Sequence, residues 1–163
     1  MTRDGEIMVL SEHLATSDRL ASRLTTVRAR IERLIPLTAD SLSTLGEDDD
    51  INILAFLKTF GQFEDTLGRT LKTIAILMQL GKVERLAARD VALRAVALGV
   101  FDDAKAWADA VRVRNELAHE YPLRPDRQAL QVNAAWDKSG TLFETAQAIA
   151  AFVKREGLLD GNL

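Results

Sequence analysis

The chain has 163 residues, of which 47% are hydrophobic, with a formal net charge of −3 and no cysteine. This length and apolar content suit a single domain, residues 1–163, with a substantial core. The lack of cysteine excludes disulfides and thiolate metal ligands, and two histidines are few for a zinc or iron centre. We therefore expect no metal ion and no cofactor. Because the net charge is acidic, any contact with RNA or DNA requires a local basic patch.

The N-terminal segment "MTRDGEIMVLSEH" (residues 1–13) has acidic residues on both sides of a short apolar run. This pattern differs from that of a signal peptide. No later apolar stretch approaches the roughly 20 residues that are needed to cross a bilayer. We expect a soluble cytoplasmic protein without membrane contacts.

The composition favours helices throughout. Prolines are few (three), glycines are sparse (nine), and the sequence shows no regular alternation of apolar and polar residues. The predicted fold class is all-α, an up-and-down bundle of four to five helices.

The first helix is predicted over residues 17–35, ending before Pro36, because apolar residues recur at steps of three and four. These apolar residues are Leu20, Leu24, Val27, Ile31 and Leu34. The other side of the helix carries Arg19, Arg23, Arg30 and Arg33. This basic side is either a solvated face or a contact for an acidic partner or for RNA.

A second helix is predicted over residues 51–80, after an acidic loop (46–50) whose charges suit a helix N-terminus. Its apolar stripe comprises Ile53, Leu57, Phe60, Leu67, Leu71, Ile74 and Met78. Glu64 interrupts this stripe, and a buried carboxylate normally requires a cationic partner. Glu64 therefore indicates either a structural ion pair or a group that orients an arginine or a histidine of a site. Gly61 and Gly68 share a face that a neighbouring helix can approach closely.

Three more helices are predicted in the second half of the chain. One covers about 83–98 and ends at Gly99, a residue typical of a helix C-terminus. The next begins at Asp102 or Asp103 and is limited by Pro122. The last follows Pro125 and extends to about residue 156. The sequence leaves open whether this helix is continuous or broken at 137–140.

The segment "RVRNELAHEYP" (residues 112–122) combines several reactive side chains. On a helix, Asn115 and His119 are four residues apart and project to one side, while Arg114 and Tyr121 are seven apart and nearly align. The segment thus offers a permanently charged planar donor, an amide, a group that titrates near neutrality and a phenol.

Such a set suits metal-free cleavage of RNA. A histidine removes the proton of the ribose 2′-OH, and an arginine stabilises the charge on the phosphoryl group in the transition state. The leaving oxygen also needs a proton donor, and the second histidine, His13, lies in a poorly patterned segment. A two-fold dimer would supply two copies of Arg114 and His119 to one cleft.

A purely structural interpretation of the same residues is also open. In that case Arg114 pairs with Glu64 or Glu116, His119 caps the helix C-terminus and Tyr121 packs. The charge balance around the segment does not favour RNA, because residues 101–130 contain more acidic than basic side chains. The basic residues are Lys105, Arg112, Arg114, Arg124 and Arg127, and the acidic ones are Asp102, Asp103, Asp109, Glu116, Glu120 and Asp126.

The stretch "RNELAHEY" (114–121) resembles the R-x4-H-x-Y signature of HEPN domains, in particular the HepT-like proteins, also described as nucleotidyltransferase substrate-binding proteins. "FEDTLGRTLK" (63–72) is similar to the Phe-Glu, Leu and Leu-Lys pattern of that family. "ALRAVALGVFDDAKAWADAVRVRN" (92–115) resembles its helix, its Gly-hydrophobic turn and its Trp-containing approach to Arg-Asn. The resemblance covers residues 52–155, and residues 1–45 form an N-terminal helix region outside it.

The resemblance implies an all-helical homodimer with a composite cleft and metal-independent ribonuclease activity. It implies that Arg114 and His119 form the catalytic pair, with Asn115 as the polar residue after the arginine. It also implies a cognate minimal nucleotidyltransferase antitoxin that transfers AMP to the motif tyrosine, Tyr121. The leading hypothesis is therefore a ribonuclease toxin of a toxin-antitoxin module. The alternatives are a non-catalytic binding subunit of a minimal nucleotidyltransferase and a helical dimer in which the motif is structural.

Overall fold

The computed structural model describes residues 1–78, 87–119 and 124–160, and of His119 it describes the backbone. Within these ranges there are six α-helices, one short 3-10 helix and no strand, so the all-α prediction is confirmed. The predicted number of four to five helices was too low, because the short helix at residues 39–43 was not predicted. The helices are α1 (Arg3–Ile31), η1 (Glu32–Leu34), α2 (Ala39–Ser43), α3 (Glu47–Leu77), α4 (Ala88–Leu98), α5 (Ala104–His119) and α6 (Pro125–Arg155).

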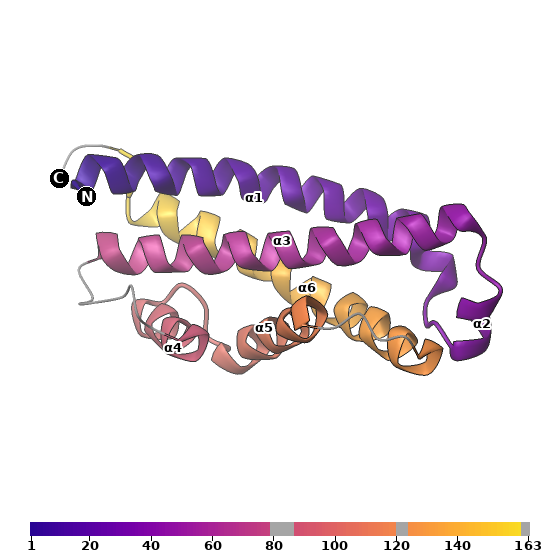
Figure 1. Ribbon diagram of the computed structural model, residues 1–163. Coiled ribbons are helices and arrows are strands. Elements are labelled where there is room, and N and C mark those ends of the chain that lie inside the picture. Colours follow the sequence, from indigo (N-terminus) through magenta and orange to yellow (C-terminus); the bar gives the residue numbers. More distant parts are fainter. Residues whose placement is uncertain (79–86, 120–123, 161–163) are drawn as a thin grey trace.

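The helices pack around α3, which contacts four of the other five α-helices (Figure 1). α1 and α3 lie side by side along their length, and α6 crosses behind α3. α4 and α5 pack on the side of α3 away from α1, and α5 also packs against α6. Because other helices pack around α3, 14 of its 31 residues are buried, and beyond its first turn the exposed residues form one stripe between α1 and α5.

α1 begins much earlier than the sequence predicted, at Arg3 instead of residue 17. The hydroxyl of Thr2 accepts a hydrogen bond from the Gly5 backbone N–H and so caps the helix. Leu10 is fully buried, which extends the apolar face of the helix toward the N-terminus. The interpretation of this segment as poorly patterned was wrong, because its apolar residues continue the later spacing.

The acidic residues 47–50 form the first turn of α3, so the prediction of a loop at 46–50 holds only for Gly46. Their carboxylates lie at the positive end of the helix, as expected, and Asp49 also pairs with Arg33. The predicted apolar stripe of this helix is buried, apart from Met78, which is partly exposed. The short helix α2 was not predicted; Thr38 and Ser41 cap its first turn reciprocally.

In the second half, the predicted boundaries at Gly99, Asp103 and Pro125 are confirmed. The predicted helix start at about residue 83 and the limit at Pro122 lie outside the described residues, within which α4 begins at Ala88. Gly99 ends α4 with a φ of 78°, a left-handed conformation that favours glycine. Asp103 caps α5, because its Oδ1 accepts a 2.9 Å hydrogen bond from the Ala106 N–H. α6 starts at Pro125 and continues without interruption through 137–140. There Ser139 is buried and donates to the Trp136 carbonyl.

None of the described helices combines the length and the apolar character that a bilayer-spanning segment requires.

Candidate functional site

α5 packs against α3 over the two glycines that the sequence singled out. A β-carbon placed on Gly61 would lie 4.0 Å from Cγ of Arg114, and one on Gly68 would lie 3.8 Å from Cζ2 of Trp107. Trp107 and Arg114 are seven residues apart, as are the glycines, so the two helices meet in antiparallel register. The prediction of a close helix approach at this face is confirmed. It brings Arg114 over α3.

Glu64 lies between the two glycines and is only 6% exposed. Its Oε2 is 3.4 Å from Nε of Arg114, so the cationic partner that the sequence required is Arg114. Burial raises the pKa of Glu64 to about 7; the positive charge of Arg114 opposes this shift and the nearby Asp65 adds to it. Near neutral pH, Glu64 is therefore an ionised carboxylate in part of the molecules only.

The guanidinium of Arg114 contacts three oxygen-bearing side chains. In addition to the Glu64 contact, Nη2 lies 3.7 Å from Oδ1 of Asp65, and Nη1 donates to Oδ1 of Asn115 at 3.4 Å. Strong charge-assisted hydrogen bonds measure about 2.7–2.9 Å, so all three contacts are long. Asp65 is held more closely by Arg69, at 2.9 Å. Arg114 is thus oriented by its neighbours without being tightly bound by any of them.

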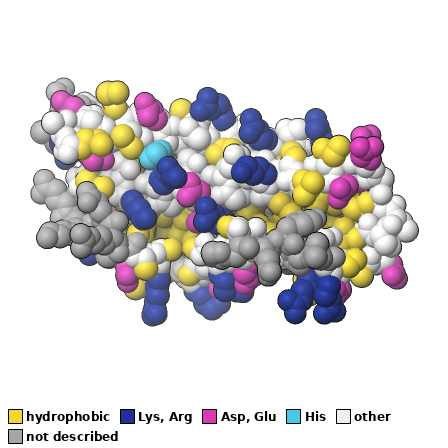
Figure 2. Space-filling view, in the orientation of Figure 1, with side chains coloured by type: hydrophobic (Ala, Val, Ile, Leu, Met, Phe, Trp, Pro, Cys, Tyr) yellow, Lys and Arg dark blue, Asp and Glu magenta, His cyan; other side chains and the backbone are white. Residues whose placement is uncertain are grey.

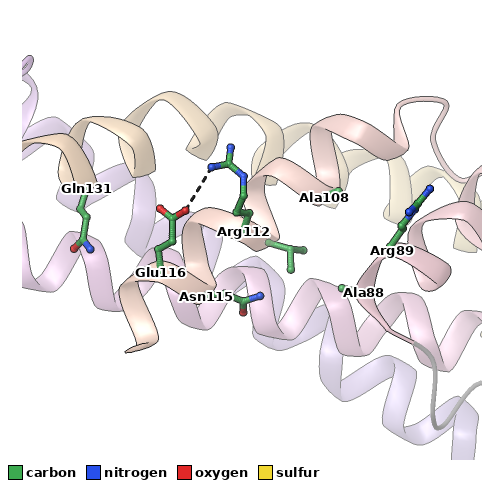
Figure 3. A pocket seen from close by; sticks show the side chains of 8 residues that line it. Ala88, Arg89, Ala108, Arg112, Asn115, Glu116 and Gln131 are labelled. Atoms are coloured by element: carbon green, nitrogen blue, oxygen red, sulfur yellow. Dashed lines mark hydrogen bonds and ion pairs between the residues drawn. The ribbon is translucent and has the colours of Figure 1, made fainter. Parts of the chain in front are cut away.

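The neighbouring acid Glu116 is not a partner of Arg114. It pairs with Arg112 across one helical turn, as Figure 3 shows. Arg112 and Glu116 border a hollow of about 620 Å³, which Gln131 of α6 and residues of α4 also line. Asn115 borders both this hollow and a smaller one that contains Glu64 and Arg114.

His119 is the last residue of α5, one turn after Asn115. Arg114, Asn115 and His119 therefore belong to one helix, as predicted. The side chain of His119 and the whole of Tyr121 lie outside the described residues.

His13 lies close enough to Arg69 and Asp65 for their charges to affect its pKa. The sequence interpretation missed this relationship. His13 lies in α1 and is partly buried. Its pKa is lowered by burial and by the positive charge of Arg69, while Glu12 and Asp65 act in the opposite direction. The spacing of Leu10 and Leu14 around it is the signal that could have placed His13 on a helix.

The described residues contain no group of three or more histidine, aspartate or glutamate side chains placed to hold a metal ion. Comparison of the chain with family models, with curated proteins and with solved structures finds no match.

Proposed function

We propose that this protein is a metal-independent ribonuclease of the HEPN, HepT-like type and acts as the toxin of a toxin-antitoxin module. The proposal starts from the resemblance of "RNELAHEY" (114–121) to the family signature. The observation that carries it is the setting of Arg114. Its side chain is 34% exposed, and its guanidinium lies over a buried carboxylate with long contacts to every partner.

Such an arginine suits binding of a phosphodiester. Glu64 fixes the direction of the side chain from below, while the exposed part of the guanidinium is open to a ligand. A phosphoryl group offers the planar fork of an arginine a shorter, bidentate contact than the present partners do. Exchange of the 3.7 Å Asp65 contact for a phosphate therefore costs little.

In the proposed reaction, His119 takes the proton from the ribose 2′-OH. The 2′ oxygen attacks the adjacent phosphorus, and Arg114 stabilises the negative charge that develops on the phosphoryl oxygens. The 5′ oxygen of the next nucleotide leaves and receives a proton from a second acid. The products are a 2′,3′-cyclic phosphate and a free 5′-OH. His119 of a second copy is the proposed second acid, so the active unit is a homodimer.

The proposed regulator is a minimal nucleotidyltransferase encoded with this protein. Transfer of AMP from ATP to the hydroxyl of Tyr121, with release of pyrophosphate, would add negative charge two residues after His119 in the chain, and this charge would compete with RNA for Arg114. Tyr121 is the only tyrosine of the chain, so the mass of the intact protein reports this modification directly.

A second candidate function is that of a non-catalytic binding subunit of such a nucleotidyltransferase. It is favoured by one observation: Glu64, Asp65 and Asn115 already occupy the guanidinium of Arg114. If these contacts serve only to hold α5 on α3, the arginine has no catalytic task. Under this alternative, His119→Ala and Arg114→Ala leave every activity of the complex unchanged.

The test is to incubate the purified protein, free of its partner, with tRNA and mRNA in the presence of EDTA. The proposal predicts cleavage that His119→Ala abolishes, and growth arrest on expression that the same change relieves. Uncut RNA together with undiminished growth arrest by His119→Ala contradicts the proposal. A heterocomplex that forms normally with either variant then supports the binding subunit.

A further inference from the structure

Three hollows meet along the exposed stripe of α3. One lies between α1 and α3, one between α3 and the end of α5, and one extends toward α4. Asp65 borders all three, so they lie next to one another. The basic residues that line them are Arg19, Arg23, Lys58, Arg69, Lys72 and Arg114. We call this surface the basic groove; Figure 2 shows Lys and Arg side chains over this face of the molecule.

The basic groove is positively charged although the whole chain carries −3. The acidic residues among its lining are Asp65 and the buried Glu64. Asp65 is neutralised by Arg69 at 2.9 Å. Within the described ranges, no acidic side chain lies within ion-pair distance of Arg19, Arg23 or Lys58.

Among the described residues of 101–130, no acidic side chain lines this groove. Asp102 and Asp103 line a separate hollow at the start of α5. Glu116 lines the hollow of about 620 Å³ that Gln131 also borders. Only the stripe of α5 that carries Arg114 faces α3. The local basic patch is thus assembled from α1, α3 and α5, and it includes Arg19 and Arg23 from the basic side that the sequence predicted for the first helix.

The shape of the groove suits an extended polyanion. Lys58 and Lys72 are fourteen residues apart on α3, which separates them by about 21 Å along the helix. Arg19 and Arg23 lie one turn apart on α1 and exposed to solvent. Among the described lining residues the one aromatic side chain, Trp107, is buried, so these residues offer no exposed ring for base stacking. Contacts to the backbone, without selection among bases, are what such a surface provides.

On the basis of the function proposed above, the geometry points to the basic groove as the binding track for the phosphate backbone of single-stranded RNA. Arg19, Arg23 and Lys58 contact phosphates at a distance from the cleaved bond, and the track delivers the strand to Arg114. Substrate recognition by this surface is tolerant of sequence, because it depends on phosphates alone.

The test measures binding separately from cleavage. The probe is a labelled single-stranded 2′-O-methyl oligonucleotide, which lacks the 2′-OH nucleophile, and its Kd is measured by fluorescence anisotropy over a series of salt concentrations. Arg19→Glu with Arg23→Glu should raise the Kd at least about tenfold and reduce the slope of log K against log salt by about 1.4, since each lost contact contributes about 0.7.

The matched control is Arg89→Glu with Lys154→Glu, which makes the same change in net charge at exposed positions of α4 and α6 outside the groove. This control should bind the probe as the wild type does. A Kd that is unchanged by the α1 variant, or raised equally by the control, overturns the track. If the α1 pair fails to fold, Lys58→Glu on α3 replaces it and is judged by the same criterion.

Cleavage of ordinary RNA by the wild type is measured in parallel. Cleavage with no effect of the α1 variant on the Kd contradicts the track and leaves the nuclease proposal standing. If the probe binds in a way that depends on Arg19 and Arg23 but ordinary RNA is not cleaved, the nuclease proposal is contradicted and the binding track is retained.

Discussion

Nε of Arg114 lies 3.4 Å from Oε2 of Glu64, a carboxylate that is almost completely buried beneath it. The pair joins α5 to α3 at the residue that we propose to be catalytic. Burial raises the pKa of Glu64 to about 7, so the strength of this contact changes within the physiological pH range.

Glu64→Gln should change how stability depends on pH. The carboxyl binds a proton more tightly in the folded chain than its ordinary pKa of 4.5 allows. Its contribution to stability is therefore fully present below pH 4.5 and is lost as the pH rises through about 7. Relative to Glu64→Gln, the wild type should lose on the order of 3 kcal/mol between pH 4.5 and pH 8.

Urea denaturation of both proteins across this range measures the difference in the free energy of unfolding. Glu116→Gln, which removes the same group from an exposed position, is the control and should follow the wild type. Parallel pH curves for the wild type and Glu64→Gln contradict the burial argument.

Two glycine substitutions should act in opposite directions. Gly99 has a φ of 78°, so Gly99→Ala should lower the free energy of unfolding by about 1 kcal/mol or more. Gly140 lies inside α6, and a β-carbon there meets nothing within 4 Å. Gly140→Ala should raise stability by roughly 0.5–1 kcal/mol, because alanine favours the helix. Thermal unfolding measures both changes in stability. If both variants are stabilised or both are destabilised, the left-handed conformation of Gly99 or the helical position of Gly140 is contradicted.

Arg28 is a structural residue within an otherwise exposed row of arginines. It donates to the Ser139 hydroxyl and to the Trp136 carbonyl, and its guanidinium carbon lies 3.9 Å from the centre of the Trp136 ring. Arg28→Ala should cost about 2 kcal/mol, because it leaves the buried Ser139 without this donor and removes the stacking. The exposed Arg30→Ala should change stability by less than about 0.5 kcal/mol. Similar denaturation midpoints for the two variants contradict the structural role of Arg28.

The sequence predicted the helical class, the end of α4 and the starts of α5 and α6 because these depend on local signals. Gly99, Asp103 and Pro125 each act on the backbone within a few residues. The apolar stripe of α3 was also predicted, from its helical spacing, and Glu64 within it correctly indicated a cationic partner. Which cation filled that role depended on the register of α5 over Gly61 and Gly68, a tertiary feature that spacing alone does not determine.

The basic groove shows the same limit more clearly. Its cations come from three helices that are up to about a hundred residues apart in the chain. Counted along residues 101–130, the charges are slightly acidic, and only the packing of α1 and α5 on α3 brings the basic side chains together. His13 was misjudged for a different, local reason, because the Thr2 cap and the buried Leu10 that extend α1 to Arg3 were not recognised in the sequence.

The most direct test of the proposed site compares two arginines of α5 that are two residues apart. Arg114→Ala removes the guanidinium above Glu64, whereas Arg112→Ala removes one that pairs with Glu116 on another side of the helix. The measurement is the single-turnover rate of RNA cleavage in EDTA, with the chemical ends of the products identified. The account predicts 2′,3′-cyclic phosphate ends, a loss of at least about a hundredfold for Arg114→Ala, and a rate near that of the wild type for Arg112→Ala. Equal rates for the two variants, with both proteins folded, would contradict it.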